Sequence, residues 1–237
     1  MDGIINLDKP AVISSARAVA RVKRLLPRGT KIGHAGTLDP FATGVLLLLV
    51  GKATKQCERL MGEAKRYEAT IKLGATTATL DPESPEEPFS GGTGLQPMRD
   101  GSEQLHGLKT PAPVDEALQR FVGQIQQRPP AFSAMKVGGQ RAYKLARSGK
   151  TVELQPRTVH VYGIELVDYA WPFLRLRVEC GRGTYVRSLA RDIGETLGVG
   201  GYLTQLRRTR IGPFEVSSAV TLEQLYADGV ERHLHPI

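Results

Sequence analysis

The sequence predicts an α+β protein with a mixed sheet. Apolar residues alternate with polar ones over residues 67–73 and 173–180, as expected of half-buried strands. Over residues 186–197 the apolar residues instead recur at helical spacing, and Gly198 follows as a helix stop. Short strands and helices therefore alternate along the chain, which is typical of the α+β class.

The other elements are predicted by local patterns. A first helix is expected to begin at Ser14 or Ser15, either of which can cap it, and to end near Leu26. The apolar run at residues 45–50 has no polar face, so it is either a strand or a helix buried on all sides. A helix is predicted over residues 114–122 and a strand over residues 158–167.

The composition is that of a globular protein with a basic excess. Of the 237 residues, 41% are hydrophobic and 24% are charged, and Lys plus Arg exceed Asp plus Glu by 32 to 24. This excess favours a polyanionic partner, although a basic surface kept for solubility would look the same. The two cysteines are too few for a disulfide framework, and no pattern of a signal sequence or membrane span is visible. A cytoplasmic location is expected.

A single domain over residues 1–237 is predicted, with two unusual segments. Residues 81–113 are rich in Pro, Gly and Ser and carry clustered acids, which predicts a long exposed insertion. Residues 128–150 contain six Lys or Arg and no acid, together with paired prolines and paired glycines. This second segment is predicted to be a loop or hairpin that can move, ending in a short helix near residues 142–147.

Motif spacing argues against three kinds of site. The five histidines are scattered and neither cysteine has a ligand partner at a useful spacing, so no metal is expected. Gly51 and Lys52 do not complete a phosphate-binding loop, because Ala53 replaces the hydroxyl residue that such a loop requires. A Gly-x-Ser-x-Gly elbow, which would carry a nucleophilic serine, is missing from the sequence.

The stretch GHAGTLDPFATG, residues 33–44, surrounds one carboxylate, Asp39, with turn-forming residues. A carboxylate held in place can act as a general base or nucleophile, but Asp-Pro is also an ordinary turn signal. Tyr185 and Arg187 open the predicted helix, where a phenol could face a planar substrate and a guanidinium could pair with a carboxylate. Tyr67 begins a strand and could stack on a base. Each residue has an equally simple structural role, so these patterns alone leave the choice open.

Taken together, these segments resemble the TruB family of tRNA pseudouridine synthases, of the bacterial type. GHAGTLDPFATG matches every fixed position of the family pattern, and five further segments match it in family order between about residues 3 and 225. These are GIINLDKP, KRYEATIKLG, PPAFSAMKVGGQRAYKLARSG, GTYVRSLARDIGETLG and YLTQLRRTRIGPF. The resemblance implies the pseudouridine synthase fold, a mixed and mostly antiparallel central sheet flanked by helices. It also implies an isomerase that converts uridine 55 in the T loop of tRNA to pseudouridine without a cofactor.

The resemblance assigns roles residue by residue. Asp39 corresponds to the essential aspartate, Tyr67 to a tyrosine near the target base, and Arg187 to the arginine that pairs with Asp39. The residues that correspond to substrate or RNA contacts are His34, Tyr185, Leu206, Lys9, Lys136 and Arg141. The basic segment 128–150 corresponds to the family's mobile segment, which closes over the T arm. The expected partner is tRNA, and the enzyme is expected to be a monomer without an obligatory protein partner and without a membrane.

Two departures from the family pattern and two alternatives accompany this hypothesis. The chain ends soon after Leu225, so the C-terminal RNA-binding domain common in the family is not expected, and residues 81–113 are longer than usual. A guide-RNA-dependent relative is one alternative, but the Ala-Thr-Gly after Phe41 and the lack of basic terminal extensions favour the stand-alone type. A non-catalytic RNA-binding or tRNA-folding module is the other, and it would gain support only if Asp39 or Arg187 were absent, whereas both are present.

Overall fold

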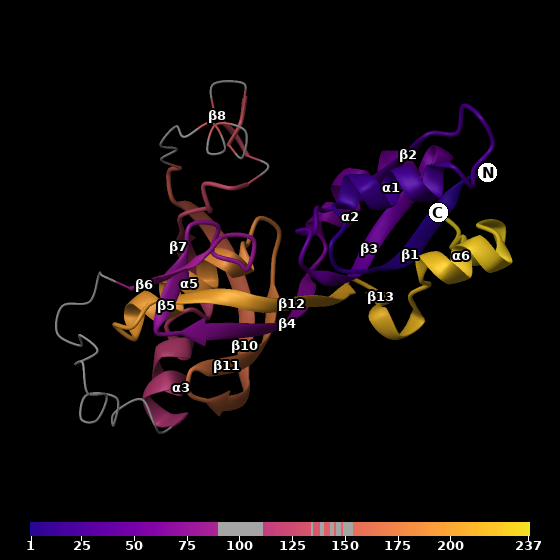
Figure 1. The fold of residues 1–237 in the computed structure, drawn as a ribbon. Helices are drawn as coiled ribbons and strands as arrows, with labels where there is room; N and C mark the ends of the chain where they lie inside the picture. Colours follow the sequence, from indigo (N-terminus) through magenta and orange to yellow (C-terminus); the bar gives the residue numbers. More distant parts are fainter. Residues whose placement is uncertain (90–110, 134, 138–139, 143–144, 146–147, 149–153) are drawn as a thin grey trace. The chain divides into compact units, whose positions relative to one another are not determined.

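The computed structural model describes residues 1–89, 111–133, 135–137, 140–142, 145, 148 and 154–237 (Figure 1). The described residues form two compact units made of discontinuous segments, and the single catalytic domain stays a prediction. The first unit comprises Met1–Glu68, Glu179–Arg182 and Gln205–Ile237, and the second comprises Ala69–Val178 and Gly183–Thr204.

Each unit contains strands and helices. The first unit holds strands β1 (Gly3–Lys9), β2 (Ile32–Ala35), β3 (Thr43–Val50) and β13 (Phe214–Glu215), helices α1 (Ser15–Lys23), α2 (Cys57–Gly62) and α6 (Leu222–Asp228), and the short helices η1 (Gly51–Gln56), η3 (Val216–Ser218) and η4 (Glu231–His233). The second unit holds strands β5 (Ala75–Thr77), β6 (Glu86–Pro88), β7 (Gly123–Gln127), β8 (Lys136–Val137), β9 (Gln140–Arg141) and β10 (Arg157–Ala170), with helices α3 (Pro111–Gln119) and α5 (Val186–Thr196). The chain passes between the units within β4 (Lys65–Leu73), β11 (Phe173–Cys180) and β12 (Gly201–Ile211).

Strand β3 lies at the centre of the first unit. It pairs antiparallel with β1, from Gly3 opposite Val50 to Lys9 opposite Gly44, and also with β2, and it pairs in parallel with β12. Leu46, Leu48 and Val50 pack in one hydrophobic cluster with α1 and α6. Val45, Leu47 and Leu49 pack in a second cluster with η1 and α2. Because both faces of β3 are covered, the residues that point to either face are buried. This explains why the run is apolar without interruption.

Helix α1 is confirmed, with Ser14 as its cap. The Ser14 hydroxyl accepts a hydrogen bond from the backbone of Arg17, at 3.2 Å. The helix ends at Lys23 rather than near Leu26. Residues 24–26 continue as a turn closed by hydrogen bonds between residues three apart, ahead of Pro27, whose ring disfavours a helical residue before it.

In the second unit, neighbouring strands follow the order β12-β4-β11-β10-β7, and β10 pairs antiparallel with β7. The predicted strands β4, β10 and β11 and the predicted helix α5 are confirmed. Helix α3 begins and ends three residues before the predicted helix over residues 114–122, and a turn then leads to Gly123, which has φ 99°. No helix in the described part of the chain is long and apolar enough to cross a membrane.

The two unusual segments are described only in part. Within the segment 81–113, Asp81 is 2% exposed and α3 begins at Pro111, and the prediction that the rest forms an exposed insertion stays a prediction. Between them, β6 pairs with β5, and residues 90–110 lie outside the described residues. In the basic segment, β8 and β9 form a hairpin with Lys136 opposite Arg141. Most of the helix predicted near residues 142–147 lies outside the described residues, and the mobility of the segment stays a prediction.

Candidate active site

Asp39 lies in the loop between β2 and β3, half-buried, immediately before the buried strand. The loop is bounded by two glycines with positive φ, Gly36 at 90° and Gly44 at 101°. A Cβ atom at Gly44 would lie 2.2 Å from the backbone oxygen of Arg208, on the neighbouring strand β12. The glycine therefore permits both the turn and the close approach of β3 to β12.

Three buried polar side chains hold the backbone of this loop. Arg208, on β12, donates from Nε to the carbonyl of Val45 at 2.7 Å and from its terminal nitrogens to the carbonyls of Gly36 at 3.1 Å and Thr37 at 3.3 Å. The Ser15 hydroxyl donates to the carbonyl of Leu38 at 2.9 Å and accepts from its N–H at 2.8 Å.

Lys9, at the end of β1, holds the other side of the loop. Its Nζ donates to the carbonyls of Pro40 at 3.3 Å, Ile13 at 2.8 Å and Pro10 at 2.7 Å, and its side chain is fully buried. The residues before and after Asp39 are thus fixed by side chains from three different elements. These hydrogen bonds restrict the positions that the Asp39 carboxylate can adopt. A catalytic carboxylate requires such a fixed position.

The charges around the loop shift several pKa values. Burial lowers the pKa of Lys9 to about 8, with the Asp39 carboxylate opposing the shift and Arg208 adding to it. Burial also lowers the pKa of His34, and Arg208 adds to this shift as well. The pKa of Tyr67 is raised by burial, with Arg208 opposing, and Asp39 contributes to the rise. These residues therefore surround Asp39 and Arg208 closely enough for their charges to interact.

The structure thus brings together four predicted residues of the first unit: Lys9, His34, Asp39 and Tyr67. Leu206, the fifth, is 7% exposed on β12, two positions before Arg208. Lys9 donates to backbone carbonyls within the protein, which supports the loop, and its predicted contact with RNA stays a prediction. Because its pKa is raised, the Tyr67 phenol keeps its proton at neutral pH.

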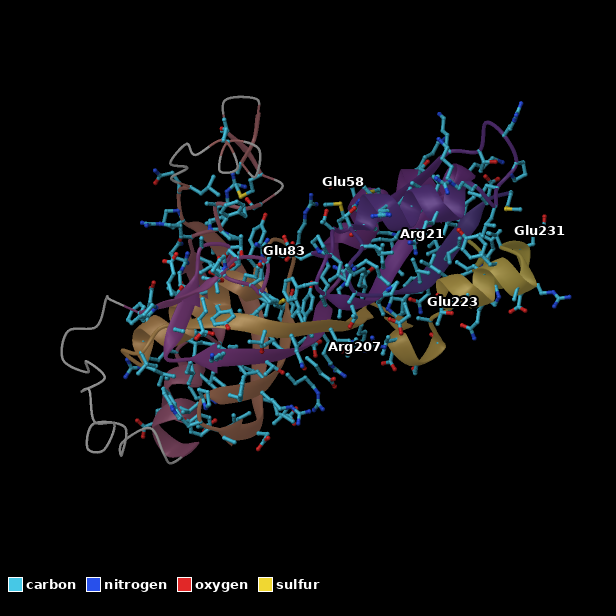
Figure 2. The ribbon with its side chains drawn as sticks, viewed as in Figure 1. Arg21, Glu58, Glu83, Arg207, Glu223 and Glu231 are labelled. Atoms are coloured by element: carbon cyan, nitrogen blue, oxygen red, sulfur yellow. The ribbon has the colours of Figure 1, made fainter. Side chains whose placement is uncertain are left out.

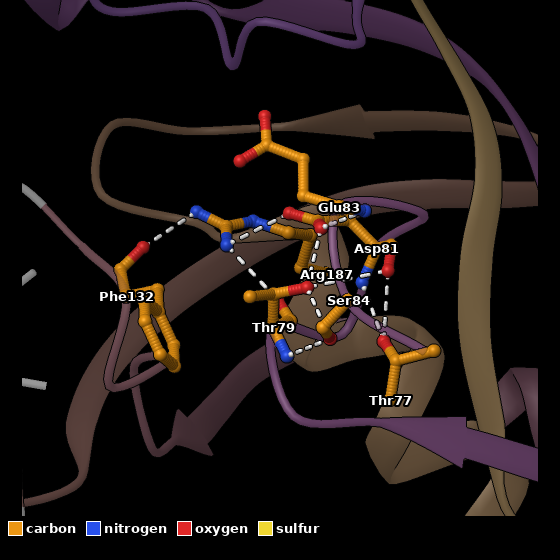
Figure 3. Close-up of polar contacts among 7 residues, drawn as sticks. All are labelled: Thr77, Thr79, Asp81, Glu83, Ser84, Phe132 and Arg187. Atoms are coloured by element: carbon orange, nitrogen blue, oxygen red, sulfur yellow. Dashed lines mark hydrogen bonds and ion pairs between the residues drawn. The ribbon is translucent and has the colours of Figure 1, made fainter. Parts of the chain in front are cut away.

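Arg187 lies in the second unit, in the first turn of α5, and is 5% exposed. Its guanidinium forms an ion pair with Asp81 at 3.1 Å, donates to the carbonyl of Thr79 at 3.0 Å, and donates to the carbonyl of Phe132 at 2.9 Å (Figure 3). Asp81 is itself fixed, because its other carboxylate oxygen accepts from the Thr79 hydroxyl at 2.6 Å and from the backbone N–H of Glu83 at 3.0 Å. The network orients the guanidinium before any substrate binds.

The remaining predicted residues also belong to the second unit. Tyr185 is half-buried at the N-terminus of α5, and the Gln127 side chain bonds both its N–H, at 2.8 Å, and its carbonyl, at 3.1 Å. For Lys136 and Arg141, the structure describes the backbone hairpin only. The predicted pairing of Asp39 with Arg187 joins residues of different units and stays a prediction.

Three residues that hold predicted site residues within their own units were not found from the sequence. Arg208 is one of several arginines in YLTQLRRTRIG, and the sequence does not distinguish it from its neighbour Arg207. In the structure Arg208 is 2% exposed, whereas Arg207 is half-buried. Ser15 was recognised as a possible helix cap, whereas its hydroxyl binds Leu38. Asp81 was assigned to the exposed segment. None of the described His, Cys, Asp and Glu residues form a group of three or more that could hold a metal ion.

The comparisons with known proteins identify the fold and the family. The fold is that of the pseudouridine synthases. Residues 23–186 match the model described as "TruB family pseudouridylate synthase (N terminal domain)", and residues 187–235 match "tRNA pseudouridylate synthase B C-terminal domain". The chain belongs to the TruB family of pseudouridylate synthases. The second match covers α5, β12, β13 and α6, and the expectation that a further C-terminal RNA-binding domain is missing stays a prediction.

Relatives of similar sequence carry one name. The chain is 46% identical over 227 residues to the tRNA pseudouridine synthase B of Xanthomonas campestris pv. campestris, a match that covers 96% of this chain and 69% of the relative. It is also 46% identical to the protein of the same name from Burkholderia mallei, with 96% of this chain and 70% of the relative covered.

Solved structures of other proteins share the fold. A chain in the crystal structure of a Cbf5-Nop10-Gar1 complex is 31% identical with a TM-score of 0.68, and the match covers 98% of this chain. A chain in an H/ACA RNP bound to a substrate RNA containing 2′-deoxyuridine is 29% identical with a TM-score of 0.65. This chain spans 57% and 56% of those two chains, respectively, which is less than two thirds of their length.

Proposed function

We propose that this protein is a tRNA pseudouridine synthase that isomerises uridine 55 in the T loop, with Asp39 as the essential carboxylate. The observation that carries the proposal is the Asp39 loop, whose backbone is fixed on both sides by buried Lys9, Ser15 and Arg208. The name shared by relatives at 46% identity supports tRNA as the substrate.

The reaction rearranges one nucleotide without oxidation or net hydrolysis. The bond between N1 of uracil and C1′ of ribose breaks, the base rotates, and a bond forms between C5 and C1′. C5 loses a proton and N1 gains one, so the atoms balance. The uridine must leave its stack, which costs a few kcal/mol, and water must be excluded so that the detached base is recaptured.

The residues of the site suit this chemistry. Asp39 is the nucleophile or general base, and both roles depend on a fixed carboxylate. Burial raises the pKa of the Tyr67 phenol and so favours its protonated form, which can pack against the base or donate a hydrogen bond. Arg187, already oriented by Asp81, would supply the positive charge that stabilises the Asp39 carboxylate.

The test follows tritium release from unmodified tRNA that carries uridine labelled at C5. The purified chain alone should release one tritium per tRNA, and Asp39→Asn should release none while still retaining tRNA on a filter. Full activity of Asp39→Asn would overturn the catalytic assignment. Replacement of the T loop should abolish release, and persistent release would mean a broader RNA specificity.

The same assay separates the alternatives. Binding of tRNA without tritium release by the wild type would favour a non-catalytic RNA-binding module. Release only after addition of a guide RNA or a protein subunit would favour the guide-dependent type. Activity of the isolated chain would instead support a monomer that acts alone.

Both cysteines are free, which supports the expected reducing, cytoplasmic location.

A further inference from the structure

One described segment carries a large excess of positive over negative charge. Residues 9–38 contain seven Lys or Arg and no acid, against a formal net charge of +8 for the whole chain. Lys9 is buried, and the other six lie on α1 or between α1 and β2. Five of them are exposed and Arg21 is half-buried; the six are Arg17, Arg21, Lys23, Arg24, Arg28 and Lys31.

Three of these arginines form a stripe, which we call the α1 stripe: Arg17, Arg21 and Arg24. Their spacing of four and then three residues places them on one side of α1, away from the side that buries Ala18 and Val22. Figure 2 labels Arg21 at this helix. The stripe extends over about 10 Å along the helix axis.

The α1 stripe does not help the helix. Like charges four residues apart destabilise a helix, and Arg17 lies near the positive end of the helix dipole, where the first turn carries no acid. Within the described residues, none of the three arginines takes part in an ion pair. The pKa of Glu223 on α6 is lowered mainly by a backbone hydrogen bond and also by the charge of Arg21. Glu223 therefore partly balances the positive charge of Arg21. A negatively charged partner would compensate the others.

The α1 stripe begins beside the Asp39 loop. Ser15, in the first turn of α1, holds both backbone groups of Leu38, and the N–H of Val12 donates to the carbonyl of Pro40 at 2.8 Å. A polyanion bound along α1 would therefore extend away from the loop that carries the reacting carboxylate. Over 10 Å one strand of a duplex presents about three phosphates, which matches three guanidinium groups.

We propose that the α1 stripe binds the phosphate backbone of the tRNA beyond the nucleotide that enters the active site. The proposal rests on the proposed function, because it takes tRNA as the substrate. It adds a contact that is independent of sequence and that contributes affinity and position but not chemistry.

The test compares two variants that lose three positive charges each. One is Arg17→Gln/Arg21→Gln/Arg24→Gln, and the control is Arg157→Gln/Arg175→Gln/Arg232→Gln, at exposed positions on other elements. The dissociation constant for unmodified tRNA is measured by filter binding from 50 to 300 mM NaCl, and kcat by tritium release at saturating tRNA. The stripe variant should bind at least about tenfold more weakly at 150 mM salt, with a salt slope smaller by about 2 and kcat within about twofold of wild type.

Each outcome decides the proposal. Equal weakening by the stripe variant and the control would mean that only bulk charge matters, and would overturn it, as would wild-type affinity of the stripe variant. The melting temperature should stay equal or rise in the stripe variant, and a fall would show that the arginines stabilise the fold instead. If wild type binds tRNA without isomerising it, the proposed function fails while the binding result still decides the stripe.

Discussion

The guanidinium of Arg208 donates hydrogen bonds to the carbonyls of Gly36, Thr37 and Val45, in the place that water would take in the unfolded chain. Arg208 is 2% exposed. A buried carbonyl that loses its donor costs about 1–3 kcal/mol, so the positions of these three carbonyls depend on this one side chain. Lysine keeps the charge but cannot reach three carbonyls with a planar fork. We expect Arg208→Lys to lower kcat by about 10- to 100-fold, about 1.4–2.8 kcal/mol in the barrier, with little change in KM for tRNA.

The neighbouring arginine is the matched control for this experiment. Arg207 is 39% exposed at its side chain and pairs with Asp8 at 2.7 Å, a surface ion pair worth about 0–1 kcal/mol. Arg207→Lys should therefore leave kcat unchanged, as measured by tritium release at saturating tRNA. A comparable loss of kcat in both variants would contradict the role given to Arg208.

Adjacent serines allow a second comparison between single residues. Ser15→Ala removes the hydroxyl that binds both backbone groups of Leu38, whereas Ser14→Ala removes only the cap of α1. Both should lower the free energy of unfolding by about 1–2 kcal/mol, measured in urea. Only Ser15→Ala should also lower kcat, by about tenfold, because only Ser15 holds the residue before Asp39. If kcat follows stability in both variants, the serine has no separate positioning role.

Between β5 and β6, the turn that contains Asp81 is coupled to the first turn of α5 through Arg187. Both side chains are nearly inaccessible, at 3% and 5%, so removal of one partner leaves the other charge buried, which costs about 3–5 kcal/mol. Asp81→Asn should therefore be strongly destabilising and should reduce tritium release. Glu165→Gln, which breaks the exposed pair with Arg177, should have no measurable effect on stability.

A double-mutant cycle tests whether the buried pair acts as one unit. Asp81→Asn and Arg187→Met should be non-additive by at least about 1 kcal/mol in the free energy of unfolding. Additive losses would mean that Asp81 acts through Thr79 and Glu83 alone and does not hold the arginine.

Elements with a clear period were predictable from the sequence, and contacts between distant segments were not. The alternation over β4 and β11 and the helical spacing of α5 are local, so they identified these elements correctly. Asp81 was misassigned because its neighbours are Pro, Glu and Ser, whereas its burial depends on Arg187, 106 positions later. A local pattern contains no information about such a partner.

At the scale of the whole molecule, the division into two units was also hidden from local patterns. Each unit combines segments from both halves of the sequence, because β4, β11 and β12 each pass from one unit to the other. The predicted site residues divide accordingly, with Asp39 and Tyr67 in the first unit and Tyr185 and Arg187 in the second. The family resemblance named these residues as a set for testing, and only the structure revealed the side chains that hold them.

The buried lysines predict how the stability of the whole chain depends on pH. Lys9 is 0% and Lys65 is 7% exposed, and burial lowers the pKa of each from 10.5 to about 8. Between pH 8 and 10.5 the unfolded chain therefore binds more protons than the folded one, so the free energy of unfolding rises with pH. Below pH 8 both lysines are protonated in both states, and their contribution is constant.

Urea unfolding at pH 7.5 and 9.5 measures this effect. We expect wild type to gain roughly 1–3 kcal/mol, and Lys9→Met and Lys65→Met each to gain less, while Lys55→Met, at an exposed position, should gain as much as wild type. The range stops at pH 9.5 because burial raises the pKa of Tyr67, so that above pH 10 the unfolded chain loses that proton first, which opposes the gain from the lysines. A decrease in the free energy of unfolding between pH 7.5 and 9.5, or an equal gain in all three variants, would mean that burial of the charged lysines does not destabilise the folded chain. In that case the hydrogen bonds from Lys9 to Pro10, Ile13 and Pro40 would fully compensate its lost hydration.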